Sequence, residues 1–246
     1  MSRRTLPDSR DSVAMSTSAT LWRAVETQHV ASTMRLVDSI EAQAVLEQAL
    51  ESSKPPIPRD CEGLDYLLHT PFRYPPSPWP SRFRGPTDPG VFYGAERART
   101  ALAEVAHWRL KVLLDAVDLR ALEPTAHTLF SVRIEAIAID VADLADASQR
   151  TAILDPDDYS TAQRWARAQR ESGIQAIRYP SVRDRPGGIC WAALQPSVFR
   201  SRPALRENWL IRVTRAGAQC NRIGEPVKRI AFDAGALLAR THELAT

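Results

Sequence analysis

The stretch SRFRGPTDPGVFYGAERARTALAE, residues 81–104, decides how this chain is expected to fold and where its chemistry is expected to lie. It runs from an arginine-rich segment through a Pro/Gly turn into a short apolar strand and then into a helix. Arg82, Tyr93 and Glu104 stand at equal spacing, one on each of these three predicted elements. Two interpretations fit this pattern: a charged surface around a core aromatic residue, or a pocket for an anionic, planar ligand.

Each of these residues also has a purely structural interpretation. If the SRFR segment is extended, Arg82 and Arg84 share one face and Phe83 points into the core, and the arginines could then be screened surface charges. Tyr93 could be a core aromatic residue with a satisfied hydroxyl. Glu104 lies beside the apolar face of its helix, a position compatible with either a solvated charge or the wall of a crevice.

The rest of the chain predicts a mixture of helices and strands. We expect helices over residues 38–54, 61–70, 96–116 and 157–173, and strands over 21–26, 91–95, 127–140, 174–181, 187–194, 208–215 and 227–233. The proline-dense residues 71–90 predict a long irregular loop, of a kind that often carries function. The expected architecture is one α+β domain over residues 20–246, with central β-sheets flanked by helices, behind a disordered tail over residues 1–19.

Composition limits the class of protein. The 246 residues are 44% hydrophobic and 25% charged, as in an ordinary soluble globular chain, and no apolar run is long enough to span a membrane. Three widely spaced cysteines without a CxxC, and five histidines without metal-ligand spacing, favour a reducing cytoplasm and no metal site. The net charge of +3 is small for a nucleic-acid-binding protein, so we expect no direct nucleic-acid partner.

A later segment, GIQAIRYPSVRDRPGG at residues 173–188, adds a strand that ends in Tyr179-Pro180-Ser181, followed by Arg183 and a Gly-rich turn. By itself, a serine at such a position commonly caps a turn, and no Gly-x-Ser-x-Gly surrounds it. In combination with the earlier stretch, the segment resembles the RES-domain family, named for an Arg, a Glu and a Ser. The earlier residues that match are Arg82-Phe83, Gly90, Tyr93 and Glu104, and the likeness covers roughly residues 20–235.

Members of this family are toxins of bacterial toxin–antitoxin pairs, and they are related in fold to ADP-ribosyltransferases. The resemblance therefore implies that NAD is the substrate, with no bound cofactor. It assigns Glu104 to stabilising the oxocarbenium-like ribose, Arg82 to holding a phosphate, and Tyr93 to offering a flat face to nicotinamide. The further NAD-binding residues that it implies are Arg73, Tyr74, Arg84 and Ser181. Among these, Ser181 would bind nicotinamide or ribose, and Arg73 would assist the phosphates or the incoming nucleophile.

The chemistry after bond cleavage stays open between alternatives. The chain could degrade NAD by phosphorolysis, with inorganic phosphate as co-substrate, or by hydrolysis, or it could transfer ADP-ribose to a protein of nucleotide metabolism. A non-catalytic protein-binding module that kept the fold is a third class, against which the intact residue set argues. The resemblance also implies a cognate antitoxin with a DNA-binding segment, forming a hetero-complex over the cleft around Arg73, Arg82 and Glu104.

Overall fold

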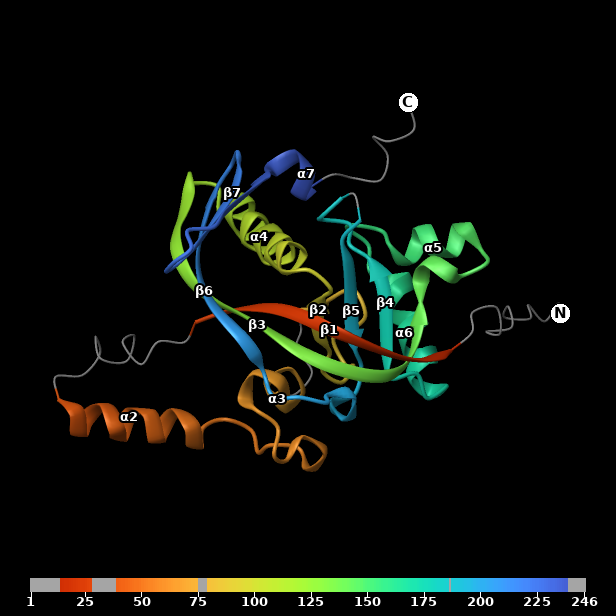
Figure 1. Ribbon diagram of the computed structural model, residues 1–246, viewed down its shortest axis with the longest axis horizontal. Helices are drawn as coiled ribbons and strands as arrows, with labels where there is room; N and C mark the ends of the chain where they lie inside the picture. Colours follow the sequence, from red (N-terminus) through yellow and green to blue (C-terminus); the bar gives the residue numbers. More distant parts are fainter. Residues whose placement is uncertain (1–13, 28–38, 75–78, 186, 239–246) are drawn as a thin grey trace.

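A computed structural model describes residues 14–27, 39–74, 79–185 and 187–238 of the chain. Its centre is an eight-stranded sheet in the order β1-β2-β5-β4-β3-β6-β7-β8 (Figure 1). The strands are β1 (Met15–Glu26), β2 (Phe92–Ala95), β3 (Ala121–Asp140), β4 (Ala176–Pro180), β5 (Ile189–Ala193), β6 (Ala204–Thr214), β7 (Gly217–Arg222) and β8 (Arg229–Asp233). Because β1 also pairs with β3, the strands β1, β2, β5, β4 and β3 close into a ring from which β6, β7 and β8 extend.

The strand β1 is longer than the sequence predicts. It pairs antiparallel with β3 from Met15 opposite Ala138 to Glu26 opposite His127. The predicted tail over residues 1–19 is therefore corrected for residues 15–19, which belong to this strand, while residues 1–13 lie outside the described residues. Small and hydroxyl side chains over residues 16–20 give no hydrophobic alternation, so their strand conformation depends on the backbone ladder with β3.

Within the described residues, six helices accompany the sheet: α2 (Ile40–Ser52), α3 (Tyr66–Arg73), α4 (Ala98–Asp115), α5 (Ala147–Ile153), α6 (Ser160–Glu171) and α7 (Ala234–Leu238). Short 3₁₀ turns lie at Arg59–Cys61, Val141–Asp143 and Pro196–Val198. In Figure 1, α4 lies beside β6 and β7, α5 and α6 lie near β4, and α2 extends away from the sheet. The predicted single α+β domain is confirmed. None of the helices in the described ranges is long and apolar enough to cross a membrane.

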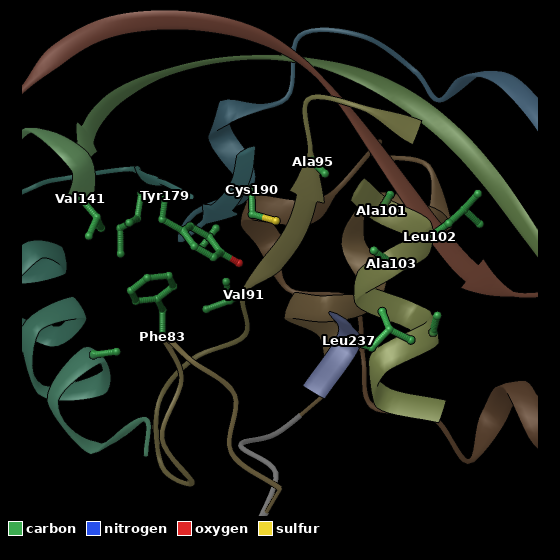
Figure 2. Packing of buried hydrophobic residues seen from close by; sticks show 14 of the residues in the cluster. Phe83, Val91, Ala95, Ala101, Leu102, Ala103, Val141, Tyr179, Cys190 and Leu237 are labelled. Carbon is green, nitrogen blue, oxygen red and sulfur yellow. The ribbon is translucent and has the colours of Figure 1, made fainter. Parts of the chain in front are cut away.

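The core explains which side of the sheet carries the site. One buried cluster joins α4, through Leu102 and Ala103, to Phe83, Tyr179 and Cys190 (Figure 2). A second cluster on the other side of the strands contains Phe92. Because successive side chains of a strand point to opposite faces, Tyr93 packs against the first cluster, on the side of α4. Tyr93 and the helix that carries Glu104 therefore lie on the same side of β2.

The predicted irregular loop over residues 71–90 is corrected at residues 71–73, which belong to α3, whereas the described residues 79–90 form turns without a helix or strand. The helix α3 continues through Pro71 to Arg73, and Ser81 and Arg84 exchange backbone hydrogen bonds of 2.8 and 3.2 Å across a tight turn. The extended conformation in which Arg82 and Arg84 would share one face is not adopted, because the chain turns between Ser81 and Arg84. Further along, a Cβ atom at Gly90 would lie 1.9 Å from the carbonyl oxygen of Pro71, so only glycine permits this close approach of the two segments.

Three elements, α5, β7 and α7, have no counterpart in the sequence prediction. The short helix α5 begins after Asp146, whose carboxylate accepts hydrogen bonds from the backbone N–H groups of Ser148 and Gln149. Strand β7 has the sequence GAQCNR, which carries little β-branched or aromatic content. It is held as a strand because β6 and β8 pair with it on either side.

Candidate active site

A cavity of about 240 Å³ opens between α4, β1, β2 and the loop that follows β4. Its wall combines one carboxylate, guanidinium groups and several aromatic rings. The side chains that matter for its chemistry are Arg82, Tyr93, Glu104, Tyr159 and Arg183, with Trp22, His107, Trp108, Tyr179 and Cys190 around them. The structure therefore brings together the three equally spaced residues of the 81–104 stretch. Such a concave site with converging polar groups is typical of a ligand pocket.

Glu104 is half-buried and is held by two donors. The Ser181 hydroxyl donates a hydrogen bond of 2.7 Å to Oε1 of Glu104, and the Cys190 thiol lies 3.5 Å from the same oxygen. The proximity of this carboxylate and burial both raise the pKa of Cys190, with burial the larger cause, so the thiol stays protonated as a donor. Glu104 is thus an oriented carboxylate at the cavity wall, rather than a solvated charge on a helix surface.

Ser181 is buried and acts in two ways at once. Its oxygen accepts hydrogen bonds from the backbone N–H groups of Arg183, at 3.1 Å, and Asp184, at 3.0 Å. These bonds cap the turn after β4, as the structural interpretation of the serine predicts. Because the oxygen accepts from these two donors, the hydroxyl hydrogen is directed at Glu104. Turn capping and the orientation of the carboxylate are therefore coupled through one side chain.

Arg82 is a rigidly held cation. It is only 7% exposed, and its Nη1 donates to the carbonyl oxygens of Ile153, at 2.8 Å, and Asp155, at 2.7 Å. The guanidinium also lies 4.8 Å from the centre of the Tyr159 ring, which is cation–π geometry. Two carbonyls and an aromatic face fix the orientation of the planar group before any ligand binds.

Tyr93 contributes its ring to the cavity while its hydroxyl is engaged elsewhere. The hydroxyl lies 2.9 Å from Oγ of Ser81 and accepts a 3.0 Å hydrogen bond from the backbone N–H of Phe83. Burial raises the pKa of this phenol, so it is neutral near pH 7. The hydroxyl thereby ties β2 to the turn that carries Arg82. The aromatic ring, rather than the hydroxyl, is what Tyr93 can present to a ligand.

Several cavity residues were missed by the sequence reasoning as site residues, namely Tyr159 and Cys190, described above, and also Arg183 and His107. Arg183 is 4% exposed, and its guanidinium donates to the carbonyl oxygen of Pro156 at 2.5 Å. His107 lies 3.0 Å through Nδ1 from the carbonyl oxygen of Leu237, and burial together with Arg183 lowers the pKa of the ring to about 3. The sequence could have predicted His107 at the site, since it follows Glu104 by three residues and residues three apart share a helix face.

None of the four predicted NAD-binding residues lines this cavity: Ser181 lies behind Glu104 and contacts it, and the other three lie further away. Arg73 donates from Nε to the carbonyl oxygen of Pro55 at 2.6 Å and forms an ion pair of 2.9 Å with Glu51, next to α2. Tyr74 is 45% exposed at the end of α3. Arg84 donates to the carbonyl oxygen of Trp79. The structure thus does not bring these three side chains to Glu104.

No cluster of three or more His, Cys, Asp or Glu side chains suited to a metal ion exists within the described ranges.

Comparison with known proteins assigns the chain to a family. The family model described as the RES domain matches residues 57–213, so the chain belongs to the RES-domain family. Arg82, Glu104 and Ser181, the residue types that give the family its name, all lie within the matched range.

Among solved structures, one similar chain comes from the crystal structure of the M. tuberculosis MbcT–MbcA toxin–antitoxin complex. It has 14% sequence identity and a TM-score of 0.41, and the match covers 83% of this chain and 88% of that chain. No curated protein matches the sequence.

Proposed function

We propose that this protein is an enzyme that cleaves NAD at the bond between nicotinamide and ribose. The observation that supports it most directly is the hydrogen bond of 2.7 Å from Ser181 to Glu104, at the wall of a cavity that also contains Arg82 and Arg183. An oriented carboxylate, guanidinium groups and aromatic rings in one pocket match the chemical parts of a pyridine dinucleotide.

The reaction places a specific demand on Glu104. Nicotinamide in NAD is already cationic, so it leaves with the electron pair of the C–N bond and needs no proton from the protein. The ribose carbon left behind develops positive charge, which a fixed carboxylate stabilises. Ser181 keeps the carboxylate in place through Oε1, and the neutral Cys190 thiol adds a second contact without adding charge.

The size of the cavity indicates which part of the substrate enters it. At about 240 Å³ it is smaller than the roughly 300–1,000 Å³ of typical small-molecule pockets. The nicotinamide–ribose end would therefore occupy it, beside the ring of Tyr93, and the adenosine end would extend outside. Arg82 and Arg183 would neutralise the diphosphate at the boundary, since planar guanidinium groups pair well with phosphate oxygens.

The acceptor of the ADP-ribosyl group defines the enzyme type. We favour inorganic phosphate, which would attack the ribose carbon and give nicotinamide and ADP-ribose 1″-phosphate. Water as the acceptor would give free ADP-ribose, and a protein side chain would make the enzyme a mono-ADP-ribosyltransferase. Purified protein incubated with NAD, with and without phosphate, distinguishes these outcomes by its products. Intact NAD in every condition would leave a non-catalytic binding module as the remaining alternative.

We further propose that the enzyme acts in the cytoplasm as the toxin of a toxin–antitoxin pair. Membership of the RES-domain family supports this role. A second argument is that an enzyme that consumes NAD harms its own cell unless a partner inhibits it. The partner would be an antitoxin with a DNA-binding segment, and a carboxylate of that partner could pair with the arginines of the cavity. Expression of this chain alone in a bacterial host should deplete NAD and stop growth. Normal growth with soluble wild-type protein would exclude the toxin role.

A further inference from the structure

The turn that joins α5 to α6 holds two arginines of the cavity. The carbonyl oxygens of Ile153 and Asp155 accept hydrogen bonds from Arg82, and the carbonyl oxygen of Pro156 accepts one from Arg183. Arg82 comes from the turn before β2 and Arg183 from the loop after β4, so two distant segments of the chain meet one short turn. A carbonyl oxygen orients a guanidinium group without cancelling its charge. Both charges therefore remain available to a ligand in the cavity.

The two guanidinium groups lie near each other. Their carbonyl partners include the consecutive residues Asp155 and Pro156, whose Cα atoms are about 3.8 Å apart. Both guanidinium charges also act on His107: after burial, which is the largest cause, Arg183 and Arg82 help to lower the pKa of this ring to about 3. Two like charges held near each other repel. A diphosphate can give each guanidinium a phosphate group of its own, and so offsets this repulsion more fully than a monophosphate.

The side chain of Asp155 fixes the shape of this turn. Its Oδ1 accepts hydrogen bonds of 2.8 Å from the backbone N–H groups of both Asp157 and Asp158. The same residue therefore binds Arg82 through its carbonyl oxygen and holds the turn through its carboxylate. At the end of the turn, Tyr159 places its ring 4.8 Å from the Arg82 guanidinium. The backbone conformation at Asp155 thus sets the positions of the carbonyl oxygens and of the aromatic ring.

We propose that residues 153–159 form a clamp that positions Arg82 and Arg183 together to bind a diphosphate in preference to a monophosphate, with Asp155 as its positioning residue. Asp155 acts through the two arginines, since it does not line the cavity itself. The inference rests on the proposed function for the identity of the ligand, which is the diphosphate of NAD. Because that diphosphate is bound equally before and during bond cleavage, loosening the clamp should raise KM and leave kcat nearly unchanged.

Calorimetric titration with ADP and AMP tests the clamp without any turnover. Wild type should bind ADP at least about tenfold more tightly than AMP, because charge-assisted hydrogen bonds to a second phosphate group add affinity. Asp155→Ala removes the acceptor of two backbone N–H groups, so it should weaken ADP binding about tenfold. Asp155→Asn keeps Oδ1 as an acceptor and should restore ADP binding to within about twofold of wild type.

Asp233→Ala is the matched control for the loss of such an acceptor. Asp233 accepts from the backbone N–H groups of Gly235 and Ala236 in the same pattern, and it does not line the cavity. This variant should bind ADP as wild type does. Equal ADP binding by wild type and Asp155→Ala, or equal weakening in Asp155→Ala and Asp233→Ala, would overturn the proposal. A wild type without preference for ADP over AMP would overturn it as well.

Tyr159 provides a second test that leaves the backbone of the turn intact. Tyr159→Leu removes the ring from Arg82 and should weaken ADP binding about fivefold, whereas Tyr159→Phe keeps the ring and should restore it. In NAD cleavage, Asp155→Ala and Tyr159→Leu should both raise KM with kcat within about twofold of wild type. A loss confined to kcat would contradict the clamp. Selective ADP binding by a wild type that does not cleave NAD would refute the proposed activity and leave the clamp standing.

Discussion

Replacing Glu104 with glutamine tests the central assignment most directly. The side chain keeps its size, and its amide oxygen can still accept the hydrogen bond that the Ser181 hydroxyl donates at 2.7 Å. The geometry around the cavity should therefore survive, while the negative charge next to the reacting ribose is lost. We expect Glu104→Gln to bind NAD and to fold normally, yet to cleave the substrate far more slowly.

The size of the effect follows from the fixed position of the carboxylate. Glu104 is held by Ser181 and Cys190 before substrate binds, so it is a preorganised electrostatic group. Removing one such group typically lowers turnover by about 10²–10³-fold, which corresponds to about 2.7–4 kcal/mol of transition-state stabilisation. The loss should appear in kcat, because the charge matters most when the ribose carbon becomes positive.

The assay is nicotinamide release from NAD under saturating substrate, together with thermal unfolding of each variant. Glu171→Gln is the matched control, because Glu171 is an exposed residue at the end of α6 and does not line the cavity. It should retain wild-type turnover and stability. Near-normal turnover of Glu104→Gln would refute the role of this carboxylate, and so would a loss explained entirely by unfolding.

Three further outcomes follow from the contacts around the site. Arg73→Ala should leave NAD turnover within about twofold of wild type in the same assay, since Arg73 pairs with Glu51 outside the cavity. A hundredfold loss of turnover would instead indicate that Arg73 binds NAD. Ser181→Ala should lower both turnover and the free energy of unfolding. The free energy of unfolding should fall by about 1–3 kcal/mol, because two backbone N–H groups lose their buried acceptor. An unchanged free energy in urea unfolding would contradict this. For His107, burial and a nearby guanidinium lower the pKa from 6.5 to about 3, so the folded ring stays neutral while the unfolded ring gains a proton as the pH falls below 6.5. The free energy of unfolding is therefore highest above pH 6.5 and falls as the unfolded ring gains its proton. Between pH 7 and pH 5, wild type should lose about 2 kcal/mol more of this free energy than His107→Gln in urea unfolding. Equal losses in the two proteins would refute the low pKa of His107.

The elements with strong local periodicity were predictable from the sequence alone. Helix α4 was expected because its apolar side chains repeat every three to four residues, and β3 because Val132, Ile134 and Ala136 alternate with charged residues. Signals of this kind are local, since they reflect the period of one helix or strand. The order of residue types along the chain also pointed to Arg82, Tyr93, Glu104 and Ser181 before any contact between them was known.

Only the tertiary structure decided which of the candidate side chains meet. Arg73 and Arg183 are both arginines beside prolines or turns, and nothing local distinguishes the one paired with Glu51 from the one that lines the cavity. The same holds for Cys190, which contacts a carboxylate 86 positions earlier in the chain. Such contacts depend on strand order and on the face to which each strand directs its side chains, and both arise from long-range pairing. The sequence by itself therefore determined the elements and the residue types of the site. The folded arrangement of β1, β2, β4 and α4 determined which residues line the cavity, because distance in space is set by packing and not by spacing along the chain.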